Sequence, residues 1–236
     1  MEKNNRLKTI PPFTKSALFT GMAQSIPIAL AVATYGVVFG VLAGQVGLEL
    51  SEAVFMSATV FAGSSQLVAL EIWAHPPPAT TLVLTTLVVN LRYILMGAAL
   101  ARWFSGLRPS YAYGSLFLMN DESWALTMGW FARGNRDAAF FLGSGLAVFI
   151  AWLSSTAIGR TVGGALAQPE RYGFDFAFTA VFVSLLCGMW RGKSDVFPWA
   201  VAACTAVIFS RLLPGSWYIL AGAVAGSITG AFTHGN

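Results

Sequence analysis

The chain has 236 residues, of which 56% are hydrophobic and only 10% are charged, and its mean hydropathy is +0.66. These values exclude a soluble globular protein and predict an all-α integral membrane protein. A net charge of +4 would suggest a nucleic-acid partner in a soluble chain. Here the basic residues lie at the ends of apolar stretches, as in membrane proteins generally. We therefore expect a lipid bilayer around the chain and no nucleic acid.

Eight apolar stretches follow one another along the chain, and at about 20 residues per span they use most of it. We expect about seven to eight transmembrane helices, with residues 1–15 as a polar tail and 16–236 as a single transmembrane domain. No room is left for a soluble catalytic or nucleotide-binding domain. The stretches are 17–45, 52–74, 79–101, 112–132, 138–168, 174–190, 196–213 and 216–233.

The basic residues predict how the chain is oriented in the membrane. If every stretch crosses, eight of them, including Lys15, Arg133 and Arg136, lie on the side of the N-terminus. Five others, including Arg102 and Arg108, lie at or near the opposite side. Because cytoplasmic loops carry the excess of Lys and Arg, we expect a cytoplasmic N-terminus.

Two stretches carry glycine at every fourth position, which bares one helix face for close packing. We expect each face to meet another helix, from this chain or from a partner. The faces are Gly36, Gly40 and Gly44 in the first stretch and Gly222, Gly226 and Gly230 in the last.

The second stretch contains Gly63, Ser64, Ser65 and Gln66 about halfway along. In transporters, helices broken near the bilayer midplane expose backbone dipoles to a substrate, and this run is suited to such a break. In the alternative interpretation, the serines bond to their own helix and Gln66 bridges to a neighbouring helix. We favour the break, because polar residues lie at the same depth in the next two stretches.

The third stretch places Asn90 and Arg92 near its centre. A charge at that depth costs at least about 2.5–3.5 kcal/mol, so Arg92 should face a protein interior or a watery cavity and have a partner. The two side chains point roughly 200° apart on a regular helix. Either the helix is broken here, or polar groups flank it on two sides.

The fourth stretch contains Asn120, Asp121 and Glu122, again near its midpoint. Two ionised carboxylates side by side in a membrane are costly, so either they pair with Arg92 or one of them is protonated. Three successive stretches thus place polar groups at one depth, and we expect a central polar site there.

The second half weakly repeats the first, with repeat-like halves at about 17–132 and 138–233. Arg92 matches Arg211 at an offset of 119, and Gly36 matches Gly159 at 123. A four-span unit would give parallel repeats and a three-span unit inverted ones, and the sequence leaves both open. Asp175 and Arg211 are the candidate site residues of this half.

Several features resemble the AzlC-like permeases, the branched-chain amino acid exporter family that includes the YgaZ type. A GxxQ motif followed by NLR at this spacing is fairly specific to the family. Tyr93 departs from the pattern, since histidine is frequent there. The matching residues are Pro27, Gly36, Phe39-Gly40, Gly44, Gly47, Met56-Ser57, the run from Phe61 to Gln66, the run from Asn90 to Tyr93, and Asp121-Glu122.

The resemblance implies a multi-pass exporter of valine, leucine and isoleucine in the bacterial inner membrane, with methionine as a further candidate. It also implies a separate small membrane subunit of the AzlD type as partner. No ATP-binding, metal-binding or nucleophile motif occurs, so we expect no cofactor, no metal and no enzymatic activity.

A hydrophobic amino acid is a zwitterion with an apolar tail, and the central residues suit each part of it. Arg92 or the backbone of residues 63–66 would bind the carboxylate, and Asn90 and Asn120 are further candidate substrate-binding residues. We expect Ser64, Ser65 and Gln66 to line the substrate path. Asp121 or Glu122 would accept the ammonium group and couple transport to protons. The alternative is a channel-like or scaffold subunit whose intramembrane charges only hold helices together.

Overall fold

The structure is a computed structural model that describes residues 12–74, 76–165, 183, 187, 190, 192–212 and 217–234. These residues form helices and no strand, which confirms the all-α membrane fold. Helices cover seven of the eight predicted stretches, and the other, 174–190, lies almost wholly outside the described residues. Four segments are long and apolar enough to cross a membrane: Lys15–Gln45, Ala79–Phe104, Ala139–Gly163 and Lys193–Leu212.

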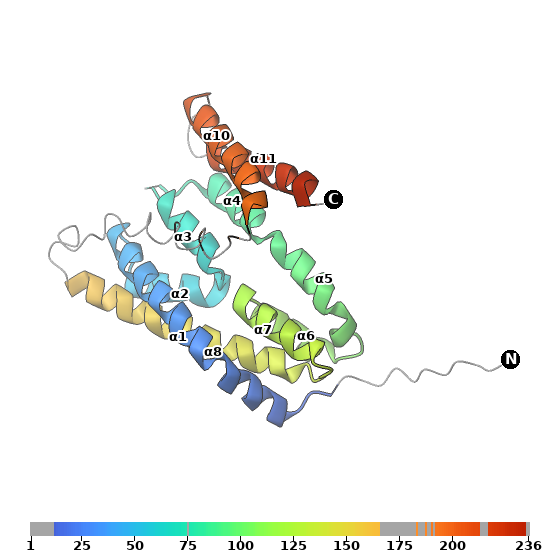
Figure 1. The fold of residues 1–236 in the computed structure, drawn as a ribbon. Coiled ribbons are helices and arrows are strands. Elements are labelled where there is room, and N and C mark those ends of the chain that lie inside the picture. Colours follow the sequence, from blue (N-terminus) through green and yellow to red (C-terminus); the bar gives the residue numbers. More distant parts are fainter. Residues whose placement is uncertain are drawn as a thin grey trace.

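Two long helices, α1 (Lys15–Gln45) and α8 (Ala139–Ala165), lie side by side and form the frame of the bundle (Figure 1). They run parallel, because Gly21 packs on the Phe140 backbone near both helix starts and Gly40 packs on Thr156 further along. The first glycine face therefore meets a helix of this chain.

The second stretch forms α2 (Leu50–Val60) and α3 (Gly63–Glu71). The break lies at Phe61, whose φ of 42° is left-handed, and at Ala62. A left-handed phenylalanine ends the first helix, since a bulky residue in this conformation does not continue it. The chain turns back after the break, and Figure 1 shows α3 leading away from α2 toward the start of α4. We call α2 and α3 the first hairpin.

The third stretch forms α4 (Ala79–Asn90) and α5 (Arg92–Phe104), which run on as one nearly continuous span. Only Leu91 separates them, and its φ of −53° and ψ of −30° remain helical. Helix α4 is antiparallel to α3, because Asn90 at its end bonds Ser65 near the start of α3. The pair thus crosses the bundle in the opposite direction to α1.

The fourth stretch forms α6 (Pro109–Phe117) and α7 (Asp121–Ala132), which we call the second hairpin. Tyr111 stacks on Phe13 just before α1, with ring centroids 4.6 Å apart. Leu118 at the break lies against Gly145 in α8. Trp130 then stacks on Phe140, back at the start of α8. Helix α7 therefore returns to the end of the bundle from which α6 entered.

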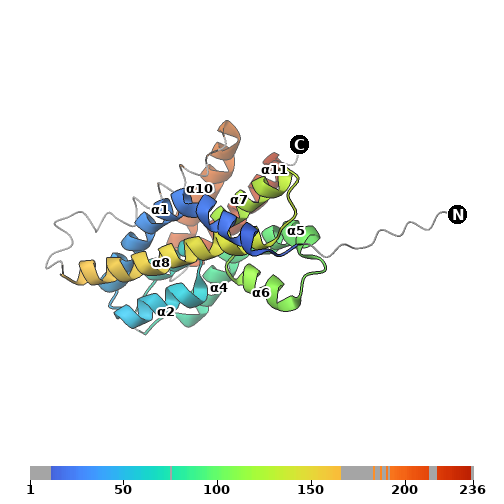
Figure 2. The ribbon, with the colours of Figure 1, turned by 90° about the horizontal axis from the view of Figure 1, so that it is seen from below.

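The two hairpins enter the bundle from opposite ends and meet in the middle. Leu48, just before α2, accepts a hydrogen bond of 2.7 Å from Arg160 near the end of α8, whereas the second hairpin enters where α8 begins. Figure 2 shows α2 and α6 at opposite ends of α8. Stretches 52–74 and 112–132 thus turn back instead of crossing. The sides predicted from the sequence for the basic residues assume that every stretch crosses, so some of these predictions need correction.

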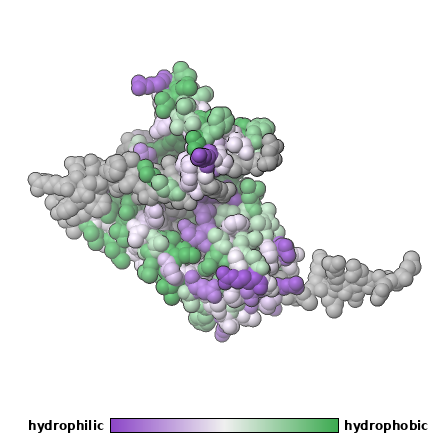
Figure 3. Space-filling model, viewed as in Figure 1, coloured by the Kyte–Doolittle hydropathy of each residue, from purple (hydrophilic) through white to green (hydrophobic). Residues whose placement is uncertain are grey.

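The correction concerns Arg102 and Arg108, which the sequence placed opposite the N-terminus. Because the second hairpin returns, the end of α5 lies at the same end of the bundle as Lys15, Arg133 and Arg136. We call this the near end. Figure 3 shows hydrophilic residues gathered there, where the chain enters α1.

Helices α10 (Val196–Leu212) and α11 (Trp217–His234) form an antiparallel pair beside α4. A short 3₁₀ helix (Lys193–Asp195) precedes them. Gly222 and Gly226 of α11 pack on Ala202 of α10, so the second glycine face is also covered from within the chain. The proposed repeat and the single domain over 16–236 stay predictions, since much of the second half is not described.

The packing of α1 on α8 predicts that Gly40→Ala destabilises the protein. A methyl group there would overlap the Thr156 carbonyl, and overpacking costs about 1–3 kcal/mol. Thermal unfolding in detergent, followed by size-exclusion chromatography, should show a lower midpoint. Gly97→Ala is the matched control, because nothing lies within 4 Å of that position. Equal midpoints for both variants would contradict the close contact.

Candidate functional site

The breaks in the three interrupted segments lie together at the centre of the bundle. Helices α3, α5 and α7 begin at Gly63, Arg92 and Asp121, within the three runs singled out in the sequence. Helices α3 and α7 follow non-helical residues, whereas α5 continues α4 through Leu91. Helix starts carry partial positive charge, so they favour negatively charged groups. Asn120 caps α7, since its side-chain oxygen accepts from the Ser123 N–H at 2.8 Å.

Arg92 joins the two hairpins. Its Nη1 lies 2.9 Å from an Asp121 carboxylate oxygen in the second hairpin. Its Nη2 donates to the Ser64 hydroxyl in the first hairpin at 2.8 Å. The guanidinium carbon lies 5.3 Å from the centre of the Tyr93 ring. Arg92 therefore has a partner from each side, and one of the two carboxyls predicted to pair with it does so.

Asn90 and Arg92 reach the same neighbouring helix despite their spacing. Ser65 donates to the Asn90 side-chain oxygen at 2.7 Å, and Ser64 accepts from Arg92. The backbone stays helical through Leu91, and two consecutive serines of α3 reach the two side chains.

A cavity of about 740 Å³ opens between α1, α8 and the two hairpins, within the usual size range of small-molecule sites. Its polar groups are concentrated on the side formed by the hairpin tips and α5. The residues that α1 and α8 contribute are mostly apolar. The polar lining is Ser64, Arg92, Asn120, Asp121 and Glu122, and the apolar lining includes Ile28, Val32, Val148 and Trp152.

Ser65, Gln66 and Asn90 do not line the cavity. Ser65 and Gln66 are buried, and Gln66 bridges α3 to α8 by accepting from the Trp152 indole N–H at 3.1 Å. The three side chains therefore hold in place the residues that do line the cavity.

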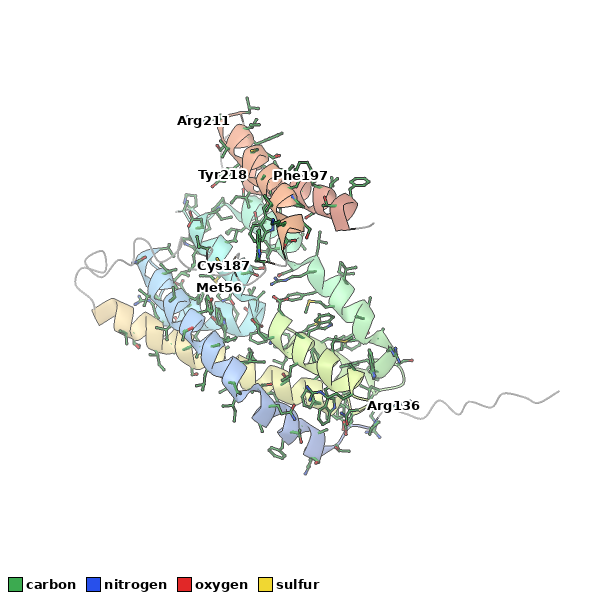
Figure 4. All side chains as sticks on the ribbon, viewed as in Figure 1. Met56, Arg136, Cys187, Phe197, Arg211 and Tyr218 are labelled. Atoms are coloured by element: carbon green, nitrogen blue, oxygen red, sulfur yellow. The ribbon has the colours of Figure 1, made fainter. Side chains whose placement is uncertain are left out.

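Of the two candidates of the second half, the structure describes only Arg211, which does not line this cavity. Arg211 lies in the last turn of α10, and Figure 4 shows it at the outer end of that helix. Asp175 lies outside the described residues. The sequence also did not single out Tyr35, Trp124 and Trp152, which line the cavity. Every one of the eight stretches contains aromatic residues, so nothing in the local sequence distinguishes these three.

Interrupted helices that meet around a central cavity with an apolar wall and an ion pair are typical of membrane transporters. Residues 27–166 match the family described as "AzlC protein". This match covers more than half of the chain, so the chain belongs to the AzlC protein family and is a membrane transport protein.

Curated relatives are similar over nearly the whole length. The inner membrane protein YgaZ of Escherichia coli is 28% identical, covering 94% of this chain and 93% of its own. The branched-chain amino acid transport protein AzlC of Bacillus subtilis is 24% identical, over 87% and 80%. An uncharacterized membrane protein of Archaeoglobus fulgidus is 28% identical, over 91% and 95%. No solved structure matches significantly.

Neighbouring serines should differ in chemical accessibility. Once Cys187 and Cys204 have been replaced, Ser64→Cys should react with a small aqueous thiol reagent, because Ser64 lines the cavity. Ser65→Cys should stay unreactive, since Ser65 is only 2% exposed. Labelling rates in membranes measure the difference. Faster labelling at position 65 than at position 64 would contradict the orientation of α3.

Proposed function

We propose that this protein is a secondary transporter that exports valine, leucine and isoleucine across the bacterial inner membrane, with methionine as a further substrate. It would act as the large subunit of a two-component system with a small AzlD-type membrane subunit, without catalysing a reaction. The observation that carries the proposal is an ion pair, Arg92 with Asp121, on the wall of a largely apolar cavity.

The cavity offers a group for each part of such a substrate. Arg92 would bind the carboxylate with its planar fork, beside the Gly63 and Ser64 backbone at the start of α3. Asp121 or Glu122 would accept the ammonium group. Asp121 is paired with Arg92, so a carboxylate that takes the place of Asp121 on the guanidinium would make Asp121 available for the ammonium group or a proton.

The positions of the basic residues support a cytoplasmic N-terminus. Among the described residues of α1 to α8, the near end of the bundle carries Lys15, Arg102, Arg108, Arg133 and Arg136. Asp137, which bonds Thr14, also lies at the near end. The other end carries Arg160 together with the acidic residues Glu49, Glu52 and Glu71. An excess of Lys and Arg marks the cytoplasmic side of a membrane protein.

Counterflow of labelled amino acids in proteoliposomes tests the function. We expect saturable exchange of leucine, valine and isoleucine, and the small subunit should be added and omitted in parallel. Non-saturating flux without side-chain preference would instead support the channel-like alternative. No flux under either condition would support a scaffold subunit.

Replacing the central arginine tests the carboxylate site. Arg92→Lys keeps the charge but loses the fork, and a lost hydrogen bond to a charged group costs about 1.5–3 kcal/mol, or roughly 10- to 100-fold in affinity. The half-saturation concentration in counterflow should rise accordingly. Arg102→Lys is the control, since Arg102 is exposed in the last turn of α5. Near-normal transport by Arg92→Lys would exclude this role.

Replacing the carboxyls tests proton coupling. A group can couple transport to a proton gradient only if its proton affinity differs between the two facing states. Asp121→Asn or Glu122→Gln should leave counterflow at least partly active but abolish accumulation driven by a pH difference. If both variants still accumulate substrate against its gradient, the coupling ion must bind elsewhere.

A further inference from the structure

The Trp152 side chain forms part of the apolar wall of the cavity. It projects from α8 and is only 4% exposed. Phe39 of α1 packs against it, with ring centroids 5.7 Å apart and an angle of 28° between the rings. The indole is therefore backed by the rigid α1 and α8 frame.

A chain of buried hydrogen bonds fixes the position of this indole. Its Nε1 donates to the Gln66 side-chain oxygen at 3.1 Å. The Gln66 amide nitrogen donates to the Ser57 hydroxyl at 3.1 Å, and that hydroxyl lies 3.1 Å from the hydroxyl of Thr156. Gln66, Ser57 and Thr156 are fully buried. Rotating the Trp152 ring or the Gln66 amide would leave buried polar groups unpaired, at a cost of about 1–3 kcal/mol each.

Gly63 packs against the indole at the cavity. It is the first residue of α3 and lines the cavity beside Trp152. A Cβ atom built at this position would lie 3.1 Å from the six-membered ring of the indole. Any other residue here would press its Cβ atom tightly against the ring.

The next residue along the chain links this apolar surface to the central charge. Ser64 follows Gly63 directly and accepts a hydrogen bond from Arg92. A ligand whose carboxylate is bound at Arg92 would therefore extend its side chain into the cavity that the indole also lines.

We propose that the edge of the Trp152 indole that lines the cavity beside Gly63, positioned by Gln66, is the surface on which the transporter selects the apolar side chain of its substrate by size. This inference rests on the proposed function, because it assumes an amino acid whose carboxylate binds Arg92. Trp152 would contact the substrate directly, whereas Gln66 is a positioning residue that acts through it.

Two substitutions should shift size selection in opposite directions. Gly63→Ala fills space above the indole, so leucine should lose more affinity than alanine. Trp152→Phe makes the wall residue smaller and so enlarges the cavity. Substrates with larger side chains, such as phenylalanine, should therefore gain affinity relative to valine. A pocket difference of one methylene is worth roughly tenfold or more, and we expect ratios of half-saturation concentrations to change by about that factor. Competition against labelled leucine counterflow measures these ratios.

Gln66 is tested by a double-mutant cycle. Gln66→Leu should change the ratios in the direction of Trp152→Phe, and the double variant should show little further change, because both substitutions act through one ring. Gly129→Ala and Trp103→Phe are matched controls that lie outside the cavity lining. They should leave the ratios unchanged.

The outcomes separate this inference from the proposed function. If the ratios of half-saturation concentrations stay constant, or if every amino acid loses the same affinity, Trp152 is not the selection surface. The proposed transport function would be unaffected by that result. Fully additive effects of Gln66→Leu and Trp152→Phe would overturn the positioning role. If the Trp152 variant does not fold, the Gly63→Ala ratios alone decide. A wild-type protein that exchanges no amino acid would overturn the proposed function first.

Discussion

A guanidinium group at the centre of an apolar bundle is the constraint on which the rest of this structure depends. Arg92 cannot be left in hydrocarbon without partners, and its two bonds draw Ser64 and Asp121 toward it from different hairpins. Ser64 and Asp121 lie in the first turns of α3 and α7, two helices that begin at a break in the middle of the protein. The buried charge and the broken helices therefore require each other.

Backbone groups freed by a break are tolerated at this depth only where protein or a cavity satisfies them. In the second hairpin, Asn120 and Ser123 bond each other's backbone around the break. In the first hairpin, the Gln66 and Ser57 side chains tie both arms to α8. The polar residues around the tips thus serve two purposes, because they stabilise the breaks and also surround the cavity.

The depth of the site could be predicted from the sequence, whereas the path of the hairpins could not. Asn90, Arg92 and Asp121 lie at the middle of apolar stretches, so their common level follows from position alone. Stretches 52–74 and 112–132 are long enough to cross. They turn back because of contacts with distant parts of the chain, such as Leu118 with Gly145, and local composition carries no sign of these. Similarly, Gln66 is conspicuous in sequence, yet its role depends on Trp152, 86 positions away.

The parallel pairing of α1 with α8 has a consequence for how the protein is made. At about 5–20 residues per second, α8 is synthesised roughly 5–20 seconds after α1 is complete. During that time α1 lies in the membrane with its glycine face uncovered and Ser25 without its bond to Ser144. The ribosome meanwhile delivers both hairpins and the crossing helix, so the frame closes around parts that are already present.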